Sequence, residues 1–289
     1  MDFKIEDNKI HFEVLNTAEK NKIEEIAENV GYENNETIKI LADREYIYMP
    51  FVNTYFYLKT LKMTMEIADI IGKPNKELKA RYEKVKKAFL DKYYDKKTCT
   101  FYKSAEAADA YGFDLGFGNE KTLKAIVDKY EKLGEFDSGI FGTDILIRVL
   151  CENGYKDLAK KLLTSEKENT FYNMKKHGAT TLWENWNGRD SRNHPMFGAV
   201  TKYLYMYLLG IRQPADSAGY EKVIISPCFV DGMNRAKGHI TTVNGVVSVE
   251  YEKNGNTATV KVFADPRIKS SFVYNGETTE FSGEKIFTV

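Results

Sequence analysis

The sequence predicts a mainly helical region followed by a small antiparallel β-sandwich. From residue 51 to residue 212, apolar residues recur at helical spacing. From residue 213 to residue 289, apolar and polar residues alternate with a period of two. The alternating runs are separated by Asn-Gly pairs, which are a strong hairpin signal, at Asn244-Gly245, Asn254-Gly255 and Asn275-Gly276. We therefore expect helical hairpins over 51–212 and six to eight short strands over 213–289.

The helical region divides into about seven amphipathic segments joined by short turns. They span residues 54–72, 75–95, 104–116, 119–134, 141–154, 155–165 and 194–210. Short connections imply antiparallel neighbours, so the helices should pack side by side as hairpins. The first 50 residues contain an alternating stretch, FKIEDNKIHFEV, and a stretch with helical spacing, KNKIEEIAENVG. Neither stretch has a pattern that indicates a function, so residues 1–50 remain a segment of unclear role.

The charge balance excludes several classes of partner. Lys plus Arg and Asp plus Glu both number 42, which gives no net charge. Such a balance predicts no nucleic-acid partner and no anionic membrane surface as a partner. The first residues, MDFKIEDNKIHFEV, lack the basic and apolar regions of a secretory signal, and no apolar run reaches the roughly 20 residues that span a bilayer. We therefore expect a cytoplasmic protein.

The sequence predicts no cofactor and no metal site. The three cysteines, Cys99, Cys151 and Cys228, are odd in number and widely spaced, which is typical of buried thiols and not of disulfides or zinc ligands. The histidines other than His194, which are His11, His177 and His239, share no metal-ligand spacing. Nucleotide-binding and serine-hydrolase motifs of the types GxxxxGK[ST], GxGxxG and GxSxG do not occur.

The strongest candidate for chemistry is the segment GATTLWENWNG, residues 178–188. The only two tryptophans of the chain, Trp183 and Trp186, flank Glu184 in this segment. Indoles can desolvate a carboxylate and raise its pKa toward that of a general acid or base, and their faces can stack on a sugar ring. The alternative is a surface glutamate beside two core tryptophans.

Two further candidates have simpler explanations. His194 directly precedes a predicted helix, where it could donate to a substrate hydroxyl or cap the helix start. Asp43-Arg44-Glu45 offers two carboxylates, and a pair of carboxylates is what glycoside hydrolysis needs. An isolated charged triplet is, however, more often a solvated loop.

Four segments together resemble one known family. They are DSGIFGTDILIRVLCENGYKDLAKKLLTS, YNMKKHGATTLWENWNG, NHPMFGAVTKYLYMYLLGI and YEKVIISP. In order and spacing they resemble the C-terminal half of the catalytic domain of bacterial α-L-rhamnosidases, glycoside hydrolase family 78, in the six-hairpin glycosidase superfamily. The resemblance covers about residues 51–264 and is strongest over residues 137–227.

This resemblance implies a fold, a reaction and a set of roles. The implied fold is a partial (α/α)6 toroid of helical hairpins followed by the small β-sandwich. The implied reaction is the inverting hydrolysis of terminal α-L-rhamnosides, with a rhamnose-containing carbohydrate as the partner. By the same resemblance, Glu184 would be the general base, Trp183 and Trp186 would line the rhamnose pocket, and His194 would contact the sugar.

The sequence also departs from the family. A complete toroid has twelve helices, and the upstream half that carries the general acid has no counterpart here. Asp43-Arg44-Glu45 does not match that acidic segment in context. Two alternatives stay open: a glycosidase portion whose missing half lies on a second polypeptide, or a non-catalytic carbohydrate- or partner-binding remnant of the family.

Overall fold

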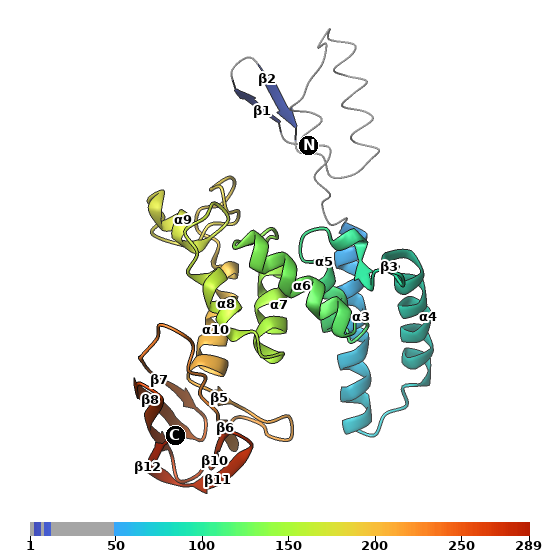
Figure 1. Ribbon diagram of the computed structural model, residues 1–289. Coiled ribbons are helices and arrows are strands. Elements are labelled where there is room, and N and C mark those ends of the chain that lie inside the picture. Colours follow the sequence, from blue (N-terminus) through green and yellow to red (C-terminus); the bar gives the residue numbers. More distant parts are fainter. Residues whose placement is uncertain (1–2, 7–8, 13–48) are drawn as a thin grey trace. The chain divides into compact units, whose positions relative to one another are not determined.

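The computed structural model describes residues 3–6, 9–12 and 49–289. The chain divides into two compact units, Met1–Asp128 and Lys129–Val289, and each is described by itself. Figure 1 labels the helices and strands. The boundary between the units falls within one helix, whereas the sequence places domain boundaries at residues 50 and 212. That three-part division stays a prediction.

The first unit contains a helical hairpin and a set of shorter elements. Its elements are β1 (Phe3–Glu6), β2 (Lys9–Phe12), α3 (Met49–Ile70), α4 (Lys76–Tyr93), β3 (Tyr94–Asp95), β4 (Thr100–Phe101), α5 (Ala108–Asp114) and the first part of α6 (Glu120–Leu133). Strands β1 and β2 pair antiparallel, as do β3 and β4. Helix α3 ends at a turn in which Gly72 has a φ of +65°, and α4 runs back beside it (Figure 1).

Aromatic rings hold this first unit together. Phe51 of α3 is fully buried, and its ring centroid lies 5.0 Å from that of Phe89 and 5.1 Å from that of Tyr93, both on α4. Tyr111 of α5 packs edge-on against the ring of Tyr55 at 4.9 Å. Helix α5 is shorter than the predicted helix 104–116. It begins only at Ala108, because Tyr102, Lys103, Ser104 and Glu106 have positive φ angles that no α-helix accommodates.

The second unit begins with the end of α6 and continues through short helices. These are α7 (Ile140–Glu152), α8 (Lys156–Leu163), α9 (Phe171–Lys176), and a continuous run of a 3₁₀ turn (Pro195–Val200), α10 (Thr201–Tyr203) and a π-turn (Leu204–Leu208). The run replaces the regular helix expected over 194–210. Helix α9 was not expected, because six residues are too few to show a helical period. Its start is fixed by Thr170, whose hydroxyl accepts the Asn173 N–H at 3.2 Å.

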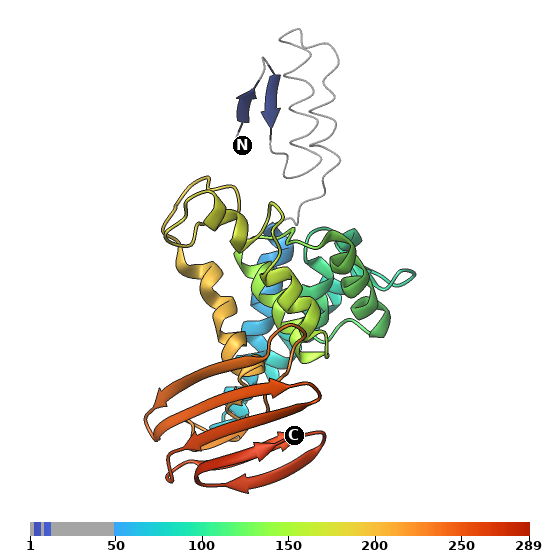
Figure 2. The same ribbon diagram turned by 60° about the vertical axis from the view of Figure 1, so that its left-hand side comes forward.

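The C-terminal part of the second unit is a sandwich of two four-stranded sheets, as the sequence predicts. The strands are β5 (Ile211–Arg212), β6 (Lys222–Ile225), β7 (Arg235–Thr242), β8 (Gly245–Asn254), β9 (Thr257–Ala264), β10 (Lys269–Tyr274), β11 (Glu277–Phe281) and β12 (Gly283–Thr288). One sheet has the order β11-β10-β6-β5 and the other β12-β9-β8-β7. Figure 2 shows these strands in orange and red. All pairs are antiparallel except β6 and β10, which run parallel.

The three Asn-Gly pairs lie at hairpins, as expected. They connect β7 to β8, β8 to β9 and β10 to β11. Only Asn275-Gly276 occupies both central positions of a two-residue turn, with φ angles of +47° and +83°. Between the sheets, alternate side chains of β8 and β9 are buried, among them Val249, Tyr251 and Val262. The two-residue period of the sequence therefore marks the core face of each strand.

Two further sequence expectations concern membranes and thiols. In residues 3–6, 9–12 and 49–289, no helix combines the length and the apolar composition needed to cross a bilayer. Cys99 and Cys151 are buried, Cys228 is half-buried, and all three are free thiols. Burial raises the pKa of Cys151 to about 12. The prediction of unpaired thiols is thus confirmed, with Cys228 less buried than expected.

We expect the substitution Gly210→Ala to destabilise the second unit strongly. Gly210 has a φ of +74°, and a Cβ atom there would lie 2.1 Å from the carbonyl carbon of Ser226. The left-handed conformation alone costs about 1–2 kcal/mol for alanine, and the backbone collision adds to it. The matched control is Gly255→Ala, because Gly255 has a φ of +63° and open space around it. Urea unfolding should show a clearly larger loss for Gly210→Ala, and equal losses would contradict this account.

Candidate active site

Glu184 lies at the end of a short hairpin formed by the segment that the sequence singles out. The His194 N–H donates to the Leu182 carbonyl at 2.8 Å, and the Glu184 N–H donates to the Ser191 carbonyl at 2.8 Å. Residues 182–184 and 191–194 therefore run side by side. The pairing fixes the backbone of Glu184, which is what a residue with a catalytic role requires.

The loop from residue 185 to residue 190 closes this hairpin. The side-chain amide of Asn185 donates to the Asp190 carboxylate at 2.7 Å and to the Arg189 carbonyl at 3.3 Å. Asp190 has a φ of +63°, a left-handed conformation that aspartate tolerates better than most residues. The guanidinium of Arg189 also contacts the Asp190 carboxylate, at 3.1 Å. These contacts turn the chain so that the following residue, Ser191, faces Glu184.

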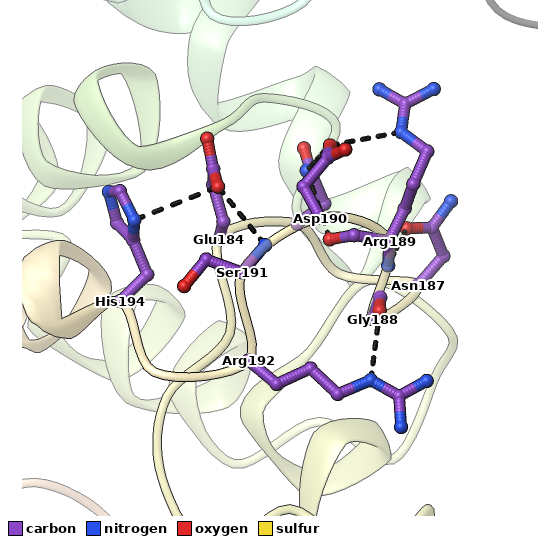
Figure 3. Close-up of polar contacts among 9 residues, drawn as sticks. Glu184, Asn187, Gly188, Arg189, Asp190, Ser191, Arg192 and His194 are labelled. Carbon is purple, nitrogen blue, oxygen red and sulfur yellow. Dashed lines mark hydrogen bonds and ion pairs between the residues drawn. The ribbon is translucent and has the colours of Figure 1, made fainter.

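The Glu184 carboxylate has two polar neighbours (Figure 3). Its Oε2 atom accepts the Ser191 N–H at 3.2 Å and lies 3.7 Å from the His194 Nδ1 atom. The Glu184 side chain is 39% exposed. In the part of the chain that the structure describes, both of these contacts are at Oε2 and none is at Oε1. The site thus holds the carboxylate in place and leaves one oxygen able to accept a proton.

Trp186 is part of a buried aromatic cluster. Its ring stacks on Phe136 at a centroid distance of 5.3 Å and an interplanar angle of 3°. The rings of Phe171 and Phe197 lie 5.2 Å and 4.1 Å away. The indole Nε1–H donates to the Ser138 carbonyl at 2.8 Å, which satisfies the one polar group of the ring. Trp186 therefore anchors the hairpin loop to the helical body of the second unit.

Trp183 packs within the hairpin itself. The Arg192 guanidinium lies over its ring at 5.2 Å, and Arg192 Nε donates to the Gly188 carbonyl at 3.0 Å. A Cβ atom at Gly188 would come within 2.7 Å of the Trp183 ring, so the close approach needs glycine, whose φ here is +72°. In Figure 3 the Arg192 side chain points away from Glu184.

The structure brings together two of the four predicted site residues, Glu184 and His194. The two indoles are buried, at 5% exposure for Trp183 and 8% for Trp186. Because successive side chains of an extended segment point to opposite sides, Trp183 and Glu184 face different surroundings. The Glu184 carboxylate thus keeps contact with solvent. Whether they line a rhamnose pocket stays a prediction, as do the roles of Glu184 and His194.

The remaining sequence predictions concern helix capping by His194, the Asp43-Arg44-Glu45 triplet and metal binding. His194 occupies the N-cap position of the 3₁₀ turn, but its side chain makes no capping hydrogen bond there. Its Nε2 atom lies 3.3 Å from the Met196 sulfur. Asp43-Arg44-Glu45 lies outside the described residues. Within the part of the chain that the structure describes, no group of three or more His, Cys, Asp or Glu side chains could hold a metal ion.

Sequence reasoning missed the residues that position Glu184. Ser191 acts through its backbone N–H, which no sequence motif marks. Asn185, Asn187, Gly188 and Asp190 are typical turn residues, and their cluster could have predicted a tight loop directly after Glu184. A tight loop there brings the residues before it, among them Glu184, next to the residues after it, among them Ser191.

The helical hairpins followed by the sandwich have the architecture of a portion of a six-hairpin glycosidase. Residues 47–208 match the model of the bacterial alpha-L-rhamnosidase 6 hairpin glycosidase domain, and residues 210–264 match that of the bacterial alpha-L-rhamnosidase C-terminal domain. The first match covers more than half of the chain. The chain therefore belongs to the bacterial α-L-rhamnosidase family.

Relatives with known names agree with this assignment. The chain is 29% identical over 240 residues to an alpha-L-rhamnosidase of Formosa agariphila, a match that covers 74% of this chain and 25% of the relative. It is 27% identical over 242 residues to one of an Alteromonas species, covering 77% of this chain and 26% of the relative. The chain thus spans about a quarter of the length of these relatives.

Solved structures share the fold. A Streptomyces avermitilis alpha-L-rhamnosidase complexed with L-rhamnose superposes with a TM-score of 0.77 at 20% identity. The superposition covers 86% of this chain and 27% of the other. An alpha-L-rhamnosidase from Aspergillus terreus gives a TM-score of 0.72 at 18% identity, covering 81% of this chain and 30% of the other. At these identities the likeness establishes the fold, and the predicted fold class is confirmed.

We expect Trp186→Ala to lower the free energy of unfolding by about 3–5 kcal/mol, because it removes a buried aromatic side chain and leaves a cavity. Trp186→Phe should cost less, since it keeps one aromatic ring in the cluster, although it loses the five-membered ring and the hydrogen bond to Ser138. The control is Tyr172→Ala, at a neighbouring position that is 41% exposed. Chemical denaturation followed by circular dichroism measures all three variants. A loss for Trp186→Ala as small as that for Tyr172→Ala would show that the cluster does not anchor the loop.

Proposed function

We propose that this chain is a portion of an inverting glycoside hydrolase that acts on terminal α-L-rhamnosides, with Glu184 as the general base. The observation that supports the proposal most directly is the position of the Glu184 carboxylate. One of its oxygens is held by the Ser191 N–H and lies near His194, and the other makes no polar contact with a described residue. Family membership and the likeness to a structure solved with L-rhamnose supply the substrate class.

In this proposal, the Oε1 atom of Glu184 takes a proton from a water molecule as that water attacks the anomeric carbon. The Ser191 N–H stabilises the carboxylate through Oε2 and fixes its rotation. His194, 3.7 Å away, contacts the sugar. We propose that Trp183 and Trp186, which are both buried, support the wall of the rhamnose pocket from behind.

An inverting hydrolase also needs a general acid. The two carboxyl groups stand about 6.5–9.5 Å apart across the sugar, which leaves room for the attacking water. We propose that the acid belongs to the upstream half of the toroid, whether that half lies on the same polypeptide or on a second one. Without that half, the sugar would meet the base but no group that protonates the leaving oxygen.

The alternative function is a non-catalytic carbohydrate- or partner-binding remnant of the family. It is supported by the sequence, because the acidic segment that carries the general acid in the family has no counterpart within these 289 residues. A site with one carboxylate can still hold a sugar through hydrogen bonds while it fails to cleave the glycosidic bond.

We expect the purified chain to hydrolyse aryl α-L-rhamnosides very slowly or not at all, and to bind L-rhamnose weakly. General acid catalysis contributes about 10²- to 10⁴-fold, and this contribution should be missing. The measurements are steady-state hydrolysis of an activated aryl α-L-rhamnoside and calorimetric titration with L-rhamnose. His194→Ala should weaken the binding of L-rhamnose, whereas Tyr172→Ala, an exposed residue outside the site, should leave it unchanged.

Glu184→Gln is the control for hydrolysis. Robust turnover by the wild-type chain that this variant abolishes would contradict the expectation, since a second carboxylate would then have replaced the missing acid. Turnover that Glu184→Gln leaves unchanged would point to a contaminating activity. If titration shows no binding of L-rhamnose, the carbohydrate-binding alternative is wrong as well.

A further inference from the structure

A cleft at one end of the sandwich lies apart from the candidate active site. It has a volume of about 600 Å³ and is bordered by the start of α8, the segment after β6, and the turns that follow β8 and β10. Small-molecule ligands occupy clefts of about 300–1,000 Å³. No residue of the hairpin that carries Glu184 lines it. We name it the sandwich cleft, and its polar and aromatic lining includes Lys156, Cys228, Phe229, Lys253, Asn256 and Asn275.

The charged side chains that line the sandwich cleft are both lysines, Lys156 of α8 and Lys253 of β8. No Asp or Glu side chain lines it, and neither lysine forms an ion pair with a residue that the structure describes. The carboxylate of Asp157, the next residue of α8, accepts the Asp231 N–H at 2.9 Å. The Val289 carbonyl, which also lies at the cleft, accepts a main-chain N–H of β9 at 2.7 Å. The lining therefore carries two positive charges that no side-chain carboxylate balances.

Lys253 points toward the inside of the sandwich. Side chains two residues apart on a strand share a face, and Val249 and Tyr251 of β8 are buried between the sheets, so Lys253 lies on the same inner face. Its cross-strand neighbour is Ala258, whose small side chain leaves room for the cleft. Strand β8 lies between β9 and β7, so this lysine does not protect a sheet edge. A half-buried lysine on an inner face usually has an anionic partner.

The group beside Lys156 is uncharged. The Lys156 ammonium lies next to the Cys228 thiol. Burial raises the pKa of this thiol above its usual value, although the positive charge of Lys156 acts in the opposite direction. The thiol is therefore neutral near neutral pH and does not balance the charge of the lysine.

A buried hydroxyl without a partner lies close to the same cleft. Tyr251 is 1% exposed, and its hydroxyl makes no hydrogen bond with a residue that the structure describes. Its ring packs edge-on against that of Phe229 at a centroid distance of 5.0 Å. Burial raises the pKa of Tyr251 to about 12, and the nearby Cys228 thiol contributes to this rise. Because an unpaired buried donor costs free energy, a hydrogen-bond acceptor in the cleft would be bound favourably.

Two side-chain amides complete the polar lining. Asn256 lies in the turn after β8 and Asn275 in the turn after β10. Neither side chain forms a hydrogen bond with a described residue. An amide offers both a donor and an acceptor, which suits the hydroxyl groups of a sugar. Two lysines together with two amides therefore suit a sugar that carries a negative charge.

We propose that the sandwich cleft binds an anionic group on a carbohydrate, either the carboxylate of a uronic acid or a sulfate ester, with Lys156 and Lys253 as its cationic ligands. Both groups present charged oxygens that accept hydrogen bonds from an ammonium group. The volume of the cleft leaves room for a sugar ring beside the anion. The anionic part of this inference rests on the lysines, and the carbohydrate part rests on the proposed function.

The probes are D-glucuronate, D-glucose 6-sulfate and uncharged D-glucose, titrated calorimetrically into the purified 289-residue chain. We expect one or both acidic sugars to bind about tenfold or more tightly than D-glucose, with an affinity that falls as salt screens the lysines. Lys253→Gln and Lys156→Gln should each weaken this binding about tenfold. Lys253→Arg keeps the charge and should retain most of the affinity.

The matched control is Lys161→Gln, which removes the same charge from an exposed position of α8 outside the cleft. It should leave the affinity unchanged, and circular dichroism should show the same fold for all variants. The proposal is overturned if neither acidic sugar binds more tightly than D-glucose, or if both lysine variants bind like the wild type. Inorganic sulfate that binds as tightly as the acidic sugars would overturn the carbohydrate part.

The result is separable from that of the proposed function. Glu184→Gln should leave the binding of acidic sugars unchanged, because Glu184 does not line the sandwich cleft. If an acidic sugar binds through the lysines and L-rhamnose does not bind, the sandwich cleft stands and the proposed function fails. If L-rhamnose binds and neither acidic sugar does, the site at Glu184 stands and the sandwich cleft fails.

Discussion

The hydrogen bond from the Trp186 indole to the Ser138 carbonyl is the contact on which the candidate site depends. A buried donor and a buried acceptor must pair, so this bond fixes the depth at which the indole enters the helical body. The rings of Phe136, Phe171 and Phe197 then close around it. These rings come from the segment before α7, the start of α9 and the 3₁₀ turn, and the hairpin that carries Glu184 is thereby held against all three.

Much of the fold could be predicted from the sequence because hydrophobic period and turn chemistry are local signals. The change of period near Pro214 and the three Asn-Gly pairs located the sandwich. The features of the fold that the sequence did not predict depend on contacts between distant residues. Helix α9 is six residues long and is specified by its Thr170 cap and by the ring of Phe171 in the aromatic cluster. The parallel pairing of β6 with β10 joins strands far apart in the chain, which no local pattern reports.

The position of the candidate site in the sequence could also be predicted, because residue type is a local signal. The only two tryptophans of the chain mark residues 183–186 as a candidate site, and in the structure the Glu184 carboxylate lies 3.7 Å from the His194 ring. The sequence could not tell which way each side chain points. Both indoles are buried, Trp183 within the hairpin and Trp186 in the aromatic cluster, whereas the Glu184 side chain is 39% exposed. The group that holds the carboxylate is the Ser191 N–H. Nearly every residue type has a backbone N–H, so the amino-acid sequence could not identify this donor.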